Sequence, residues 1–295
     1  MIVVISCIFF LVRLTPGNPF SSDRVMNEET LESLERMYGM DKPLIQQYYD
    51  YIRGLLRLDF GMSYKHIGTR INSIIFKDFD SGFWLSIRFG IIVIVITVIC
   101  GVLLGFASVL NPGGLLDKFV NLCSIIGIAI PVVIIAPMLV LTFAVKWRFF
   151  ATSQWAFDMY HLTLPVIALS IPNVCTLAQI QRTSLIDVMN SPFINTARAK
   201  GLGFRDILIK HALKPSLIPV ISFLGPASAS ILAGTVVIEK TFGFPGMGTL
   251  TVNAAIDRDY SMVLALVAIY SVLLITFNII VDILYGFIDP KVRIK

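Results

Sequence analysis

The stretch FGIIVIVITVICGVLLGFASVL, residues Phe89–Leu110, carries no charged side chain. A helix needs about 20 such residues to cross the hydrocarbon core of a bilayer, so this stretch predicts a membrane-spanning helix. Four more uncharged stretches of adequate length follow it: Phe119–Val145, Leu162–Ile180, Pro215–Ile238 and Tyr260–Val281. Charged residues make up only 15% of the 295 residues, against about 25% in soluble domains. We therefore expect an all-α membrane protein.

The apolar segment Met1–Leu14 is shorter, and Arg13 lies near its end. A cleaved signal peptide is the alternative interpretation, but no basic residue precedes the apolar run and no small-x-small cleavage site follows it. We interpret the segment as a first membrane helix that lacks residues at its N-terminal end. The chain is then expected to have six transmembrane helices, with a long loop, residues 15–88, after the first of them.

Positive charge is concentrated on one side of this arrangement. Six helices put both termini on the same side as the linkers Asn111–Lys118 and Gln181–Lys214 and the tail Asp289–Lys295. The second linker contains several basic residues and only two aspartates; the basic residues are Arg182, Arg198, Lys200, Arg205, Lys210 and Lys214. Because short loops rich in Lys and Arg stay in the cytoplasm, we place this side and both termini there.

The long outer loop has apolar residues at helical spacing in two stretches, Glu29–Tyr38 and Leu44–Leu56. Asp41 followed by Pro43 favours a helix start before the second stretch. We expect two amphipathic helices that lie on the external surface. Either they shield the membrane helices or they form a docking surface for an external partner.

Prolines inside the predicted spans are the next feature of the sequence. They are Pro131, Pro137, Pro165, Pro172, Pro219 and Pro226. A proline interrupts the hydrogen-bond ladder of a helix and kinks it. Kinked spans fit a transporter whose helices must rock, and they also fit ordinary packing between bent helices.

The most informative linker segment is Ser191–Lys214. Ser191 and Pro192 form a favourable helix start, and Gly201 suits a left-handed residue at the helix end. A second helix, Phe204–Lys214, would carry Phe204, Ile207, Leu208 and His211 on one face, with Pro215 opening the next span. We expect a helical hairpin that projects from the membrane with Phe193, Ala197 and Phe204 exposed. Exposed apolar residues rimmed by charge are typical of a protein–protein surface.

This hairpin resembles the docking element of importer permeases in the ABC transporter superfamily. Their signature is Glu-Ala-Ala, three residues, Gly, nine residues, then Ile-x-Leu-Pro; Ala197, Gly201 and Leu213 match it. The positions that depart from it are Asn195, Thr196, His211 and Lys214. The run TARAKGL, followed by HAL, is similar to the form found in the dipeptide, oligopeptide and nickel importers.

Further matches extend the resemblance over nearly the whole chain. They are LTPGNP at 14–19, LDFGMSY at 58–64 with Leu58 in place of a glycine, HLTLP at 161–165, EKTFGFPGMG at 239–248 and DPK at 289–291. The long loop after the first span resembles that of the B-type permease of the pair. The resemblance implies a permease core at 89–295, made of five spans and a coupling loop at 182–214.

The resemblance also implies a division of labour. The chain has no GxxxxGK[ST] phosphate loop, so ATP and Mg²⁺ are expected on two cytoplasmic ATPase subunits and no cofactor on this chain. A sister permease and an external solute-binding protein complete the expected complex. The implied ATPase-coupling residues are Phe193, Ala197, Arg198, Lys200, Gly201, Phe204 and Leu213. Arg198, Lys200 and Arg205 either pair with acidic groups on the ATPase or are solvated positive-inside charges.

The segment Glu239–Gly248 follows the fifth predicted span on the outer side. We expect it to fold back at the mouth of the path, where a gate and a plain turn are the two interpretations. The candidate gate residues are Glu239, Phe242, Pro245, Gly246 and Gly248.

Other function classes fit the sequence less well. Catalytic chemistry inside the membrane needs ionisable groups at mid-depth, and the five long spans have them only at their ends. The three histidines and four cysteines show no metal-ligand spacing and no CxxC pair, so no metal site is expected. A channel or secondary transporter remains the second alternative. Peptides are the expected substrate, with nickel chelates or another small solute as the alternative.

Overall fold

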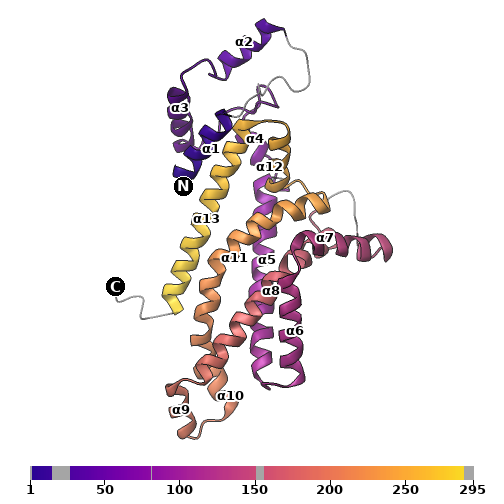
Figure 1. Cartoon of the computed structure of the whole chain (residues 1–295), viewed down its shortest axis with the longest axis vertical. Helices are drawn as coiled ribbons and strands as arrows, with labels where there is room; N and C mark the ends of the chain where they lie inside the picture. Colours follow the sequence, from indigo (N-terminus) through magenta and orange to yellow (C-terminus); the bar gives the residue numbers. More distant parts are fainter. Residues whose placement is uncertain (1, 15–26, 81, 151–155, 289–295) are drawn as a thin grey trace. The chain divides into compact units, whose positions relative to one another are not determined.

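The computed structural model describes residues 2–14, 27–80, 82–150 and 156–288, so the matches at 15–19 and 289–291 lie outside the described residues (Figure 1). The described chain is helical, with two isolated backbone bridges, Met62–Arg70 and Gly82–Gly246. It divides into two compact units. Unit 1 comprises Met1–Ile87 and Phe244–Leu273, and unit 2 comprises Arg88–Gly243 and Leu274–Lys295.

Unit 2 is built around one long helix, α8 (Met159–Met189), which packs against α6, α7 and α11. Its helices are α5 (Gly82–Val109, from Arg88 on), α6 (Leu115–Ala129), α7 (Val132–Leu139), η1 (Val140–Lys146), α8, α9 (Pro192–Ala199), α10 (Phe204–Asp206), η2 (Ile207–Ala212), α11 (Leu213–Phe242) and the end of α13 (Tyr260–Ile288). The segments η1 and η2 are π-helical.

Four helical segments of the described chain are long and apolar enough to cross a membrane: Gly82–Val109, Met159–Met189, Phe204–Ala229 and Tyr260–Phe287. A fifth candidate consists of α6 together with α7 and η1, which are bent by 102° at the break between them. The helix α1 (Ile2–Leu14) is shorter, at 13 residues. The chain is therefore a helical membrane protein with four or five candidate spans among the described residues.

The predicted span Phe119–Val145, which contains Pro131 and Pro137, is broken into two helices. Ile130 and Pro131 both have extended backbones, with ψ of 117° and 146°. Proline disfavours helical geometry in the residue before it and has no N–H to donate, so the helix ends at Ala129 and a new one begins at Val132. Pro137, Pro165, Pro172, Pro219 and Pro226, in contrast, lie inside helices.

Two glycines of α5 allow a close approach to α8. A Cβ atom on Gly105 would lie 2.6 Å from the Ala178 carbonyl oxygen, and one on Gly101 would lie 2.5 Å from a methyl carbon of Leu177. Only glycine fits at such distances. The spacing of the two residues is the GxxxG pattern by which membrane helices pack backbone to backbone.

Unit 1 contains both predicted amphipathic helices, α2 (Glu28–Met37) and α3 (Leu44–Leu56), so their prediction as helices is confirmed. Its other helices are α1, α4 (Ile71–Ile75), α12 (Met247–Ile256), and the start of α5 and α13. The core of the unit includes Ile71, Ile75 and Met247, and Tyr51 of α3 packs against it. The Tyr51 hydroxyl donates a hydrogen bond of 3.3 Å to the carbonyl oxygen of Leu264.

One buried carboxylate organises the loop in this unit. Asp259, only 2% exposed, accepts hydrogen bonds from the backbone N–H groups of Tyr64 (3.0 Å) and Met262 (3.2 Å), and from the hydroxyl of Ser63. It thereby caps the start of α13 and holds the LDFGMSY stretch. Leu58, the residue that replaces a glycine in that stretch, has φ of +58°, a conformation that favours glycine.

Candidate functional site

The turn at the tip of the predicted hairpin has a well-defined geometry. Helix α9 ends at Ala199, and Gly201 follows with φ of +81°. The N–H of Gly201 donates to the Arg198 carbonyl at 2.9 Å, and the N–H of Leu202 donates to the Ala197 carbonyl at 3.4 Å. These two bonds form a Schellman motif, which needs a left-handed residue at the position of Gly201. The predicted left-handed conformation of Gly201 at the helix end is confirmed.

The inner face of the hairpin is an apolar cluster that joins it to the ends of α5 and α8. Its fully buried members are Val109, Leu185, Ile194, Ile207, Leu208 and Ala212, and Met189 and Ala197 are nearly so. The prediction that Ala197 is exposed is therefore wrong, since its side chain is only 8% exposed and packs inside this cluster. His211, predicted on the same face as Leu208, is exposed.

The second leg of the hairpin is continuous with a membrane span. The chain is helical from Phe204 through α10, η2 and α11 to Phe242, so the predicted boundary between a short helix and a span at Pro215 is wrong. A π-helical turn spaces the hydrogen bonds five residues apart and often accommodates irregular positions inside a helix. Pro215 lies just after η2, and the wider hydrogen-bond spacing of this π-helical turn accommodates the missing N–H of the proline.

The first leg joins a helix that is longer than predicted. The predicted linker starts at Gln181, but α8 continues to Met189, so Arg182 lies inside a helix. Arg198 of α9 donates a hydrogen bond of 3.2 Å to the Met189 carbonyl. The carbonyls that end a helix carry partial negative charge, so this guanidinium stabilises the end of α8.

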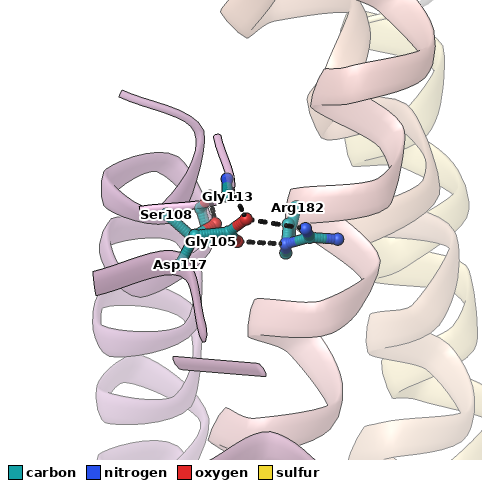
Figure 2. Close-up of polar contacts among 5 residues, drawn as sticks. All are labelled: Gly105, Ser108, Gly113, Asp117 and Arg182. Carbon is teal, nitrogen blue, oxygen red and sulfur yellow. Dashed lines mark hydrogen bonds and ion pairs between the residues drawn. The ribbon is translucent and has the colours of Figure 1, made fainter. Parts of the chain in front are cut away.

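A bidentate ion pair joins α6 to α8. Arg182 Nε and Nη2 donate to Asp117 Oδ1 and Oδ2 at 2.5 and 2.9 Å, and the Gly113 N–H donates to the same carboxylate at 2.9 Å (Figure 2). Asp117 is 5% exposed. Nearby, the Ser108 hydroxyl donates to the Gly105 carbonyl. The pair therefore fixes α8 against the α5–α6 turn.

The outer face of the hairpin combines apolar and basic side chains. Phe193 is 49% exposed and Phe204 44% exposed, and Leu202 between them in the sequence is also exposed. Lys200 and Arg205 are exposed, whereas Leu213 is half-buried. The hairpin lies beyond the ends of α8 and α11 in unit 2 (Figure 1). The structure thus offers exposed aromatic residues on a projecting element, supported from inside by Ala197.

The candidate gate residues fall into two groups. Glu239, which is fully buried, and Phe242 belong to the last turns of α11 in unit 2, so the helix continues past Ile238, the predicted end of the span. Pro245, Gly246 and Gly248 belong to unit 1. There the Pro245 carbonyl accepts a hydrogen bond of 2.7 Å from the Gly82 N–H, which ties the turn to the start of α5. A gate formed by both groups remains a prediction.

The sequence reasoning missed several residues that have structural roles within the two units. Gly101 and Gly105 carry a recognisable signal, the GxxxG spacing. Asp117 and Arg182 are 65 positions apart, and no local pattern links them. Asp259 directly precedes a long apolar helix, and this is the position of a helix cap. The contact between Asp259 and Ser63 cannot be recognised in the sequence.

Comparison with known proteins gives matches over most of the chain. Residues 97–294 match the family model described as "Binding-protein-dependent transport system inner membrane component". The oligopeptide transport system permease protein OppB of Haemophilus influenzae is 42% identical over 294 residues, covering 99% of this chain and 95% of the relative. The dipeptide transport system permease protein DppB of Bacillus subtilis is 37% identical over 294 residues, covering 100% and 94%.

A solved structure has a similar fold. The crystal structure of an amino acid ABC transporter with histidines matches with a TM-score of 0.56 at 15% identity, covering 69% of this chain and 91% of the other. At that identity the likeness concerns the fold alone. The family match covers most of the chain, and the relatives cover nearly all of it. This chain therefore belongs to the family of binding-protein-dependent transport system inner membrane components.

Proposed function

We propose that the chain is the transmembrane permease subunit of an ATP-driven importer of oligopeptides or dipeptides. The observation that carries the proposal is the identity of 37–42% over nearly the whole chain to permeases named for oligopeptide and dipeptide transport. The nickel alternative is not favoured, because none of these names refers to a metal. The chain itself is a transport subunit and not an enzyme.

The proposed complex contains a sister permease, two cytoplasmic ATPase subunits that bind ATP and Mg²⁺, and an external solute-binding protein. In the proposed topology, six spans place both termini and the hairpin in the cytoplasm, and α2 and α3 lie outside. Closure of the ATPases on ATP would move the hairpin, and the spans would alternate between inward-open and outward-open states. Such coupling requires an element that responds to the remote ligand as a unit.

The hairpin has the properties of that element. Phe193, Leu202 and Phe204 present apolar surface to a partner, and the buried cluster around Ala197 joins the hairpin to the ends of α5 and α8. Lys200 and Arg205 are free to attract acidic groups on an ATPase or to remain solvated. Arg198 has a structural role in this proposal, because it binds the end of α8.

Purification of the tagged chain in mild detergent tests the complex. Co-elution of a second permease and ATPase subunits, with ATP hydrolysis stimulated by a peptide-loaded binding protein, is the expected result. A stable homo-oligomer without ATPase activity, under conditions where related complexes survive, would instead indicate a channel or secondary transporter.

Substitutions in the hairpin test the coupling site. Gly201→Pro cannot adopt φ of +81° and removes the N–H of the Schellman motif, and Ala197→Trp does not fit the buried cluster. We expect both to abolish peptide uptake while the chain still inserts into the membrane. Asn195→Ala, at an exposed position of the same helix, is the matched control and should transport normally. Normal uptake by both hairpin variants would refute the coupling assignment.

A further inference from the structure

Two neighbouring cavities run along one side of α8 in unit 2. The first, of about 430 Å³, is lined by α8 from Thr176 to Asp187 and by Pro219 of α11. The second, of about 380 Å³, is lined by Asn173 and Thr176 of α8 and by Pro131, at the break between α6 and α7. Thr176 lines both, so the two cavities lie next to each other along the helix, and we refer to them together as the hollow.

The side chains that α8 presents to this hollow are mostly polar. Asn173, Thr176, Gln179, Thr183 and Asp187 recur every three or four positions, which places them in one stripe on the helix. The side chains of Gln179, Thr183 and Asp187 are exposed in the single chain. The opposite side of α8, with Leu177 and Leu185, is buried.

The exposed face of α5 shows what a lipid-facing stripe looks like in this molecule. Ile91, Val95, Ile99 and Leu103, spaced four residues apart, are all exposed and all apolar. Polar and ionisable groups are expensive in contact with lipid and are found facing protein or water-filled cavities. The α8 stripe lies on a candidate span of similar length, so it does not face lipid.

We propose that the stripe Asn173–Thr176–Gln179–Thr183–Asp187 is the wall of the translocation path, and that it binds the amide groups of a peptide backbone. This inference rests on the proposed function. Hydroxyl and carboxamide groups both donate and accept hydrogen bonds, as a peptide amide does. The side chains of Gln179 and Thr183 make no hydrogen bond to any described residue, so their capacity is available to a substrate.

The chemistry of the wall sets which part of a peptide it recognises. It has no basic residue, and its one carboxylate, Asp187, lies two residues from the end of α8. Apart from this carboxylate at its end, the wall consists of neutral groups, which interact with the backbone that all peptides share and do not discriminate between peptide side chains. The permease would therefore accept peptides of varied sequence, and their selection would depend on the binding protein.

The exposed faces of the two helices provide a direct test by cysteine labelling. In the full complex in proteoliposomes, the four native cysteines are first replaced by serine or alanine in a variant that retains uptake. Thr176→Cys, Gln179→Cys and Thr183→Cys are then compared with Ile99→Cys and Leu103→Cys. A water-soluble thiol reagent should modify the α8 positions at least about tenfold faster, and a transported tripeptide with its binding protein should slow that reaction.

Equal rates on α5 and α8, or fast labelling of α8 that the tripeptide does not change, would overturn the proposal. The proposal would also be overturned if the α8 cysteines cross-linked to the sister permease and the thiol reagent did not modify them. The stripe would then be a contact between the two subunits. These outcomes leave the proposed function intact. That function fails separately if the unsubstituted complex shows no ATP-dependent peptide uptake.

Removal of the hydrogen-bonding groups gives a second readout. Thr183→Val keeps the shape of the side chain, and Gln179→Leu nearly does. The pair together should slow tripeptide uptake about tenfold, while ATP hydrolysis stimulated by the binding protein remains. Ile99→Leu on α5 is the control and should change neither rate. Unchanged uptake by the double variant would contradict the assignment.

Discussion

Two buried carboxylates, Asp117 in unit 2 and Asp259 in unit 1, are held in different ways. Asp117 faces the guanidinium of Arg182, 65 positions away, and one backbone N–H. Asp259 is held by backbone N–H groups and the hydroxyl of Ser63, with no arginine or lysine side chain bound to it among the described contacts. Both are nearly inaccessible, at 5% and 2% exposed.

The difference shows two ways to satisfy a buried charge. At Asp117 a second charge compensates the first, so the pair depends on both partners, and loss of one leaves an uncompensated ion. At Asp259 the compensation is spread over several donors that also define a turn and a helix start. The first arrangement joins two helices at one point, and the second shapes a loop. Substitution of the residues in each arrangement should therefore have a different effect on stability.

The largest effect is expected for Arg182→Met. The substitution leaves Asp117 buried, with the Gly113 N–H as the donor that remains to its carboxylate among the described residues. Breaking a fully buried pair costs about 3 to 5 kcal/mol of stability. The Arg182 side chain is 26% exposed, so the cost here should lie toward the lower end of that range. The midpoint of thermal unfolding in mild detergent should fall strongly, and the chain should be depleted from membranes. A midpoint equal to that of the unsubstituted chain would show that the pair contributes nothing.

A double substitution separates the charge from the packing. With Asp117→Asn added to Arg182→Met, no buried ion remains, so most of the lost stability should return. If the double variant were as unstable as the sum of the single ones, the loss would come from the shape of the side chains and not from the unpaired carboxylate.

An intermediate effect is expected for Asp259→Ala. It removes the acceptor for the N–H groups of Tyr64 and Met262 and for the Ser63 hydroxyl. The loss of one helix cap and of buried hydrogen bonds should cost about 2 kcal/mol. Protease digestion should cut the Leu58–Tyr64 stretch faster than in the unsubstituted chain. Unchanged digestion would mean that other contacts hold this loop.

The smallest effect is expected for Asp158→Ala, the matched control for Asp259. Asp158 caps α8 by accepting a 2.9 Å hydrogen bond from the His161 N–H, but its side chain is about half exposed. Substitution should lower the unfolding midpoint less than Asp259→Ala does. An equal or larger loss would show that burial adds nothing to the strength of such a cap.

The same residue gives a pH dependence of known sign. Hydrogen bonds from the backbone and ring of His161 hold the pKa of Asp158 below its ordinary value. The charged form is thus favoured in the folded chain, and its contribution is present above the ordinary pKa of about 4 and lost as pH falls through the lowered value. The difference in unfolding midpoint between the unsubstituted chain and Asp158→Ala should therefore shrink in acid.

The regular helices followed from sequence pattern. Uncharged stretches located the long spans, and apolar periodicity located α2 and α3 to within about a residue. The tip of the hairpin followed from Gly201, since a left-handed turn leaves a local signature. In these cases the residues within one helix or turn are sufficient to determine its conformation.

Contacts between elements were not predictable in the same way. The burial of Ala197 depends on α5 and α8. The helix breaks at Pro131 but continues through Pro165 and Pro172, although the residue is the same. The upper part of the polar stripe of α8, from Asn173 to Gln179, was inside the span Leu162–Ile180, which was defined only by its lack of charge, and the rest of the stripe was assigned to the following linker. Apolar content alone does not show which face of a span meets lipid.

The two legs of the hairpin are attached to the rest of unit 2 unequally. One leg runs as unbroken helix from Phe204 to Phe242, whereas the other passes through the non-helical turn at Asn190 and Ser191 before α9 begins. A force applied at the tip would be transmitted stiffly along the first leg and yield at the second. A displacement of the tip would then move α11 more than it moves α8.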